Sequence, residues 1–240
     1  MDNKFDAAVN KAKEYLYKPR DATHDINHHI AVWKNCQKII EKENIKVNSD
    51  LVKVAAFWHD VILSKEKKVS LDDVKETVNY LNKYLPLSGF DKKEVKIITQ
   101  AVLHHEFRNS PKNIEGLILQ DADKLDVLSL DRWDRTLSAY KSGKMGEDKY
   151  KSYIKTGLKW LPIIESTLHY NYSKLLARRL IEETFENHEF ISVFKDIGLE
   201  SEFNEYLKVK NSFKTKLVNL YINLSNFILF VRVNLKSLFQ

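Results

Sequence analysis

The chain has 240 residues, of which 43% are hydrophobic, so it can build a packed core, which argues against general disorder. It contains only 6 Gly and 4 Pro, and this scarcity of helix breakers favours long helices over strands joined by tight turns. Lys and Arg outnumber Asp and Glu by 39 to 33, giving a modest surplus of +6. A surplus of this size suits an anionic substrate, but no basic run accompanies a nucleic-acid motif. No specific nucleic-acid binding is therefore expected.

The cysteine content and the N-terminus bear on the compartment. Cys36 is the single cysteine, so no intrachain disulfide can form and a reducing compartment is expected. It falls within a helical apolar pattern, which is typical of a small core residue and not of a nucleophile. Residues 1–13 lack the basic and then apolar order of a signal peptide. We therefore expect a soluble, cytoplasmic protein.

Apolar residues recur at helical spacing along most of the chain, so the expected fold is all-α. In chain order, the pattern predicts helices over 3–17, 24–43, 50–63, from Ser70 to the residue before Pro86, and 91–104. A loop over 109–113, a short apolar run over 116–119 and an acidic segment over 121–126 are expected next. Further helices are expected over 126–141, 147–168 and 171–195, with turns near Gly143, Gly146 and Gly198.

The turn at Gly198 suggests a division into a compact domain, residues 1–197, and a C-terminal helical extension, residues 198–240. The apolar stretch Leu217–Leu235 contains four Asn, one Ser and one Arg, which makes it a poor membrane-spanning helix. An amphipathic helix of this kind packs against its own domain or another copy of the chain, or makes weak contact with a membrane surface. Packing is the expectation that we favour.

Histidine and acidic residues gather in four places: residues 24–29, 59–60, 104–106 and 121–126. Imidazole nitrogens and carboxylate oxygens together suit a divalent metal ion, and these residue types do not distinguish Mn, Mg, Co, Ni, Fe and Zn. His59 and Asp60 end an apolar helix, where leaving either one buried and unpaired would cost several kcal/mol. A His–Asp pair satisfied within the core would explain these two residues but not the three other clusters. The clusters therefore predict a metal site built from several segments.

The order His28, His59-Asp60, Asp123 resembles the H…HD…D signature of the HD superfamily of metal-dependent phosphohydrolases. The resemblance is nearest to small bacterial members with the motifs HDxxHxxRV, HD, HxF and QDADRLD. The corresponding segments here are residues 24–32, 58–61, 105–107 and 120–126, and the likeness covers roughly residues 20–190. Each motif alone is weak, but their combination in this order is specific. The resemblance implies an HD-domain helical bundle.

Carried over position by position, the resemblance assigns the metal ligands: His28, His59, Asp60 and Asp123. His24 and Asp25 would then line the site, and His105 would face the substrate or a second ion. Asp121 and Asp126 would have supporting roles. Asp60, His24, Asp25 and His105 are the candidates for handling protons in catalysis, and the sequence does not rank them.

One departure from the family pattern concerns phosphate binding. Ala31 stands where the family has the Arg of HxxRV, so another cation would have to meet the phosphate. The candidates are Lys65, Lys67 and Lys68, which follow the HD pair, and Lys124, which replaces the Arg of DADRLD. Nearby aromatic residues could stack on a base, although each is more often a core residue: Trp33, Phe57, Phe107 and Trp133.

The expected activity is therefore hydrolysis of a small phosphoester or phosphoanhydride, with nucleotides as the leading substrates, by a water molecule that the metal activates. The main alternative is a catalytically degenerate HD-fold protein with a binding or regulatory role, which the loss of the family Arg would favour. A metal-dependent oxygenase and a purely structural helical protein are more remote alternatives.

Overall fold

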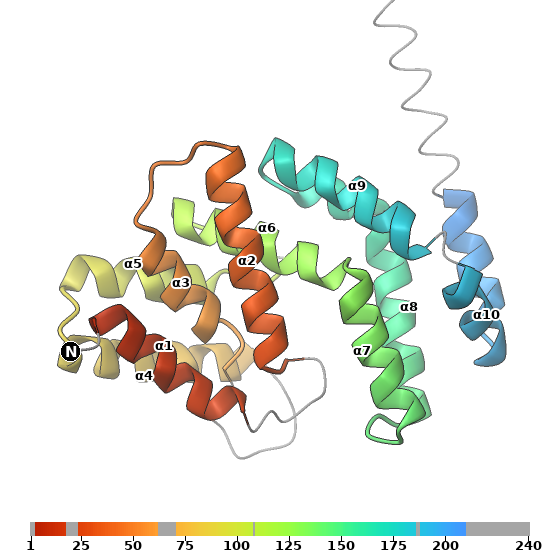
Figure 1. Ribbon diagram of the computed structural model, residues 1–240, viewed down its shortest axis with the longest axis horizontal. Coiled ribbons are helices and arrows are strands. Elements are labelled where there is room, and N and C mark those ends of the chain that lie inside the picture. The colour runs from red at the N-terminus through yellow and green to blue at the C-terminus, as the bar shows by residue number, and fades with distance from the viewer. Residues whose placement is uncertain (1–2, 18–23, 62–70, 108, 186–187, 210–240) are drawn as a thin grey trace, which may run out of the picture.

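The computed structural model describes residues 3–17, 24–61, 71–107, 109–185 and 188–209, and every regular element in these ranges is helical (Figure 1). The all-α prediction is confirmed. In chain order the elements are α1 (Lys4–Leu16), α2 (Ile26–Lys42), α3 (Ser49–Trp58), α4 (Leu71–Leu87), α5 (Lys92–Leu103), α6 (Ile114–Val127), α7 (Leu130–Lys141), α8 (Glu147–Ile164), the 3-10 turn η1 (Glu165–Thr167), α9 (Asn171–Phe185) and α10 (His188–Asp196). Residues 200–209 are also helical.

Helix α3 lies at the centre of the N-terminal half of the molecule. It packs against α1, α2, α5 and α6, and Figure 1 shows these helices grouped around it. Its sequence, SDLVKVAAFW, is apolar on almost every side, and all seven of its hydrophobic residues are buried. A helix without a polar face is stable only when other helices surround it. The last turn of α3 therefore delivers the next two residues, His59 and Asp60, to the interior of the bundle.

Side-chain caps fix where the helices around α3 begin. Asp25 precedes α2 and accepts a hydrogen bond from the His28 amide, and Asn113 precedes α6 and accepts one from the Gly116 amide. Asp91 and Glu94 form a capping box at the start of α5. Each cap satisfies a backbone donor that has no partner within its helix. These caps set the register that turns His28 and Asp123 toward the same region.

The acidic segment 121–126 differs from the expectation. It was predicted to follow a short apolar run, with a helix beginning at 126, but residues Ile114–Val127 form one helix, α6, and α7 begins at Leu130 after the Ser129 cap. The helix continues because its acidic side chains find partners inside the protein. Gly116 lies close to the segment that precedes α6, since a Cβ there would lie 2.8 Å from Asn113 Oδ1 and 3.1 Å from Pro111 Cβ.

Two further boundaries also differ from the expectation. Helix α4 was predicted to stop before Pro86, but it ends at Leu87, with the proline in its last turn. There the ring can break at most the final hydrogen bonds of the helix. The single helix expected over 171–195 is two helices, α9 and α10, and α10 packs against α9.

Packing does not stop at Gly198, the expected edge of the domain. Leu199, Phe203 and Tyr206 are buried and belong to the same core cluster as the residues before the turn. The Phe203 ring lies 5.1 Å from the ring of Phe194 in α10. Residues 199–206 therefore contribute to the core, while the division into a domain over 1–197 and an extension over 198–240 stays a prediction.

This packing predicts a specific loss of stability. Phe203→Ala should lower the free energy of unfolding by about 3–5 kcal/mol, because it removes a fully buried aromatic ring from the core. Glu205→Ala, on the exposed side of the same helical segment, is the matched control and should change it by less than about 0.5 kcal/mol. Urea denaturation of the full chain measures both values. Equal, small effects would show that the segment is an appendage.

No helix within the described ranges is both long and apolar enough to cross a membrane. The apolar stretch Leu217–Leu235 lies outside the described residues. Its predicted packing or membrane contact stays a prediction.

Candidate metal centre

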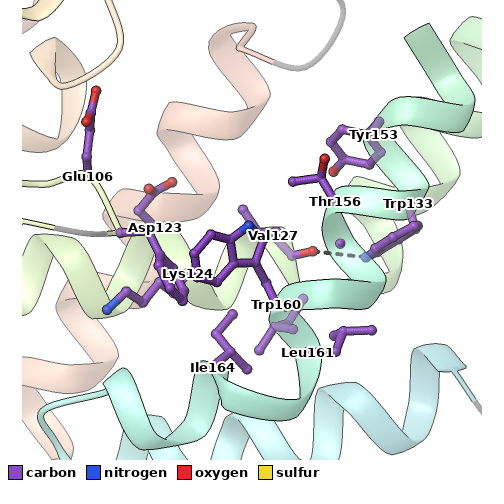
Figure 2. Close-up of a pocket in the computed structure, with 13 residues that line it drawn as sticks. Glu106, Asp123, Lys124, Val127, Trp133, Tyr153, Thr156, Trp160, Leu161 and Ile164 are labelled. Carbon is purple, nitrogen blue, oxygen red and sulfur yellow. Dashed lines mark hydrogen bonds between the residues drawn. The ribbon is translucent and has the colours of Figure 1, made fainter. Parts of the chain in front are cut away.

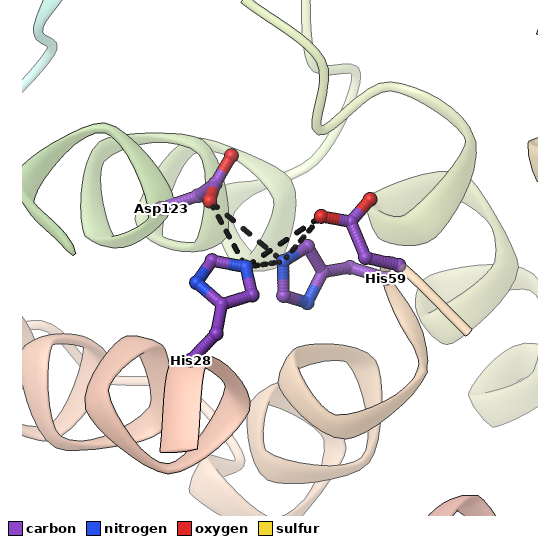
Figure 3. Close-up of side chains that lie close together, drawn as sticks. His28, His59 and Asp123 are labelled. Atoms are coloured by element: carbon purple, nitrogen blue, oxygen red, sulfur yellow. Dashed lines mark hydrogen bonds and ion pairs between the residues drawn. The ribbon is translucent and has the colours of Figure 1, made fainter. Parts of the chain in front are cut away.

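Four side chains from three segments converge near the middle of the N-terminal helices. His28 comes from α2, His59 and Asp60 follow the end of α3, and Asp123 comes from α6. One ligand atom from each of the four lies within 4.8 Å of the others. Figure 3 shows the His28 and His59 rings pointing toward each other, with the Asp123 carboxylate above them. The structure thus brings together all four residues predicted to bind a metal.

The hydrogen bonds of the two imidazoles leave electron pairs facing one another. His59 Nδ1 lies 2.8 Å from the Ala56 carbonyl, and His28 Nδ1 lies 2.7 Å from Asp126 Oδ2. Both partners can only accept, so each Nδ1 carries a hydrogen and donates it. In the neutral rings the lone pairs are then on the two Nε2 atoms, which lie 3.1 Å apart. Two lone pairs at this distance repel each other unless a proton or a cation lies between them.

Two carboxylates add negative charge to the same point. Asp60 Oδ2 lies 3.4 Å from His59 Nε2 and 3.5 Å from His28 Nε2, while Asp123 Oδ1 lies 3.8 Å and 3.5 Å from them. Burial alone would raise the pKa of Asp60, but the facing imidazoles, His59 first, hold its pKa well below the usual value. Burial likewise opposes the imidazoles at Asp123, and the contacts with His59 and His28 outweigh it and lower its pKa, so both carboxylates are ionised. Two nitrogen and two carboxylate donors form a set that fits a divalent cation.

The metal-free site compensates for this charge with protons. Burial lowers the pKa of His28, but hydrogen bonds to Asp126 and Asp60 outweigh it and raise the pKa to about 9. The pKa of His105 is likewise raised to about 9, because its contact with Asp60 outweighs burial. The proton on His28 Nε2 lies among His59 Nε2, Asp60 Oδ2 and Asp123 Oδ1. A metal ion would take the place of that proton.

Two more histidines flank Asp60 outside the four-residue cluster. His105 follows α5, and its Nε2 lies 3.1 Å from Asp60 Oδ1, while its Nδ1 donates to the Val102 carbonyl. His24 precedes α2, and its Nε2 lies 3.7 Å from Asp60 Oδ2. Both therefore lie where the sequence predicted, beside the candidate ligands. Asp60 therefore contacts these two imidazoles as well as the other members of the four-residue cluster.

Asp126 supports the cluster from behind. It is almost fully buried, and its Oδ2 accepts from His28 Nδ1 at 2.7 Å and lies 3.6 Å from Arg132 Nη1. Arg135 Nη2 lies 3.8 Å from the other carboxylate oxygen. A carboxylate behind a ligand histidine fixes the orientation of the ring and makes its outer nitrogen a better donor. The supporting role expected for Asp126 stays a prediction.

Asp121 makes its contacts at a different place. Its carboxylate accepts hydrogen bonds from the backbone amides of His169 and Tyr170, just before α9. It therefore ties the start of α9 to α6 and does not face the cluster.

The remaining predicted site residues have other partners or lie outside the description. Asp25 caps α2 and accepts from Arg135 Nη1 at 3.0 Å. Lys124 is buried, and its ammonium donates to Gln120 Oε1 and the Thr167 carbonyl and lies 4.9 Å from the centre of the Phe107 ring. Burial also lowers the pKa of Lys124. Lys65, Lys67 and Lys68 lie outside the described residues. The roles assigned to these five residues stay predictions.

Arg135 was not predicted, although it joins several parts of the site. From α7 it binds Asp25 at the start of α2 and Asp131 on its own helix, besides approaching Asp126. The spacing of Asp131, Arg132 and Arg135 places both guanidinium groups near one face of α7. This spacing was visible in the sequence, but nothing there indicated that the face meets α2.

A cavity of about 470 Å³ adjoins the four-residue cluster, and Asp123 lines both (Figure 2). Its walls come from α6, α7, α8 and the segment after α5, and consist mainly of apolar and aromatic side chains: Phe107, Val127, Leu128, Trp133, Tyr153, Trp160, Leu161 and Ile164. Glu106, Asp123 and Lys124 lie together on one side of Figure 2. Phe107 and Trp133 were among the expected aromatic residues, whereas Trp160 was not. Trp160 lies on α8, outside the motif segments, so nothing in the sequence indicated that it lines a cavity.

Comparison with known proteins identifies both the domain and the fold. Residues 25–128 match the sequence model of the HD domain. A predicted HD superfamily hydrolase from an uncultured Thermotogales bacterium has the same fold, with 22% identity over 80% of this chain and 91% of that chain and a TM-score of 0.57. Bacillus subtilis YpgQ in complex with ADP has 22% identity over 80% and 94% of the chains, with a TM-score of 0.57. A protein from Lactobacillus plantarum has 19% identity over 82% and 97%, with a TM-score of 0.59. No curated protein matches the chain.

Proposed function

Because residues 25–128 match the HD domain, we propose that this chain is a metal-dependent phosphohydrolase acting on a small phosphoester or phosphoanhydride, with nucleotides as the leading substrates. The observation that carries the proposal is the meeting of two imidazole lone pairs and two ionised carboxylates beside a cavity large enough for an organic group. Lone pairs and negative charges held this close together repel one another, and a bound cation would remove that repulsion. B. subtilis YpgQ has the same fold, and its complex with ADP supports a nucleotide as the substrate.

His28, His59, Asp60 and Asp123 would hold the metal ion. When bound, a divalent ion in such a site lowers the pKa of water and neutralises charge on a phosphoryl oxygen. Hydrolysis forms a bond between a water oxygen and phosphorus and breaks the bond from phosphorus to the leaving oxygen. The water loses a proton, and the leaving oxygen gains one or departs as an anion.

The residues around Asp60 are suited to these proton movements. His105 holds a proton at Nε2, directed at Asp60 Oδ1 3.1 Å away, and can donate it to a leaving oxygen. His24 approaches Asp60 Oδ2 from another direction and is the candidate to accept the proton of the attacking water. Asp25 is a weaker candidate, because its carboxylate already caps α2 and binds Arg135.

A substrate screen tests this proposal. Purified protein with added Mn, Mg, Co or Ni should hydrolyse at least one of a panel of nucleoside mono-, di- and triphosphates and simple phosphoesters. Measuring phosphate and pyrophosphate separately identifies the bond that is broken, and a chelator should stop the reaction. A protein that binds metal but hydrolyses no member of the panel would contradict the proposal. That result would favour a degenerate HD domain with a binding role, consistent with Ala31 in place of the family Arg.

A further inference from the structure

The cavity beside Asp123 differs in character from the metal cluster that it touches. The cluster is made of imidazoles and carboxylates, whereas most of the cavity wall is apolar. In Figure 2 the Asp123 carboxylate lies at one side, the Trp160 indole in the middle, and Trp133 and Tyr153 at the other side. A ligand that fills this space has a polar end near the metal site and an apolar or aromatic part farther along α8.

Four of the residues that line this cavity are aromatic: Phe107, Trp133, Tyr153 and Trp160. The Phe107 and Trp160 rings have centroids 4.1 Å apart with an interplanar angle of 56°, and the Trp133 and Tyr153 rings are 5.5 Å apart. Gly157 lets the Trp133 indole lie against α8, because a Cβ there would meet Trp133 Cη2 at 2.9 Å. The volume of about 470 Å³ is within the roughly 300–1,000 Å³ typical of small-molecule pockets. Flat aromatic groups bind to such walls by stacking.

Groups that read the hydrogen-bonding edge of a base are scarce in the same wall. Among the described lining residues there is no Asn, Gln or Arg side chain, the groups that form two hydrogen bonds at once with the edge of a purine. The carboxylates of the lining, Glu106 and Asp123, lie on the same side of the cavity in Figure 2. The ammonium of Lys124 already binds Gln120, the Thr167 carbonyl and the face of Phe107. Tyr153 and Thr156 are the hydroxyl groups of the lining. The wall is therefore better suited to a flat surface than to one particular base.

We infer that this cavity holds the aromatic base of a nucleotide substrate by stacking, with Trp160 as a principal contact and with little selection among bases. The inference rests on the proposed function, because the nearness of Asp123 is what makes the cavity part of a reaction site. It goes further than the proposed function in two respects: the base is the part of the substrate that the cavity binds, and nucleotides with different bases are all accepted. A stacking site tolerates every base, since each has a similar π face.

The binding test uses nucleosides, which carry no phosphate and so bind independently of metal and hydrolysis. Equilibrium dialysis with labelled adenosine, cytidine and uridine should show saturable binding to the wild-type protein, with dissociation constants within about tenfold of each other. Trp160→Leu keeps apolar bulk but removes the stacking face, and it should weaken adenosine binding on the order of tenfold. Trp160→Phe keeps an aromatic face and should stay within about threefold of wild type.

Tyr17→Leu is the matched control, because Tyr17 is an exposed aromatic residue at the end of α1 and does not line the cavity. It should bind adenosine as the wild type does, and thermal melting checks that each variant is folded. If Trp160→Leu does not fold, the Trp160→Phe variant and the comparison of nucleosides still decide the matter. Absence of nucleoside binding, wild-type binding in Trp160→Leu, or a spread above about a hundredfold among nucleosides would overturn the inference.

A kinetic arm separates this inference from the proposed function. Trp160→Leu should lower kcat/KM for ATP, CTP and UTP by similar factors, mainly through KM. Hydrolysis of nucleotides without any effect of Trp160→Leu would overturn the stacking site and leave the phosphohydrolase proposal standing. Nucleoside binding in a protein that hydrolyses no phosphate compound would contradict the phosphohydrolase proposal and leave the stacking site standing.

Discussion

His59→Ala should remove the bound metal and reduce phosphate hydrolysis to background. His59 Nε2 lies within 3.1–3.8 Å of the three other candidate ligand atoms, and the ring is fully buried. Loss of a partner behind a metal ligand already costs about 10- to 100-fold in metal affinity or activity, and loss of the ligand itself should cost more. Elemental analysis of the purified variant and the hydrolysis assay measure the two effects.

The matched control for this variant is His169→Ala. His169 lies just before α9, contacts Gln120 and is not part of the cluster. It should keep the metal content and most of the activity. Thermal melting of both variants shows whether a loss arises from unfolding. Full metal content or wild-type turnover in His59→Ala would remove this histidine from the assignment.

Asp123→Asn and Asp126→Asn should affect different properties of the protein. Asp123→Asn should abolish metal binding and activity. It should cost little stability, because the Asp123 carboxylate lies beside Asp60 and two imidazoles and pairs with no buried Arg or Lys side chain in the described part of the chain. Asp126→Asn should lower metal affinity only about 10- to 100-fold, since an amide oxygen can still accept from His28 Nδ1. Asp126→Asn is therefore the milder change for activity.

Stability should show the opposite order. Asp126 lies near the guanidinium groups of Arg132 and Arg135, and Arg132 is almost fully buried. Removing the negative charge should cost about 3 kcal/mol, in the range expected when one partner of a buried ion pair is lost. Denaturation of the two variants without metal measures the free energy of unfolding, and metal titration measures the affinity. A greater loss of activity in Asp126→Asn than in Asp123→Asn would show that the wrong aspartate was assigned to the metal.

The helical fold and the meeting of the four candidate ligands were accessible from the sequence for physical reasons. Apolar residues at helical spacing identify α1, α2, α3 and α5, and their ends follow capping residues such as Asp25 and Asp91. His59 and Asp60 stand out because polar groups at the end of an apolar helix require partners. The order of the motifs then related His28 and Asp123 to this pair.

Other features depend on contacts between distant segments. Helix α6 was not recognised as one helix, because the partners of Asp121 and Asp126 come from the segment before α9, from α2 and from α7. The positions of Arg135 and Lys124 have the same origin, since each side chain binds residues from other parts of the chain. Trp160 was missed because a cavity between α6, α7 and α8 has no sequence motif.

The most direct test of the account is the metal content of the purified full-length protein, measured by elemental analysis before and after dialysis against a chelator. We expect close to one divalent ion per chain, bound by His28, His59, Asp60 and Asp123. Its removal should lower the melting temperature, because a ligand that binds the folded state stabilises that state. Re-addition of the metal should restore the melting temperature. A protein that carries no metal, takes up none on titration with Mn, Co, Ni or Zn, and melts at the same temperature with and without chelator would contradict the account.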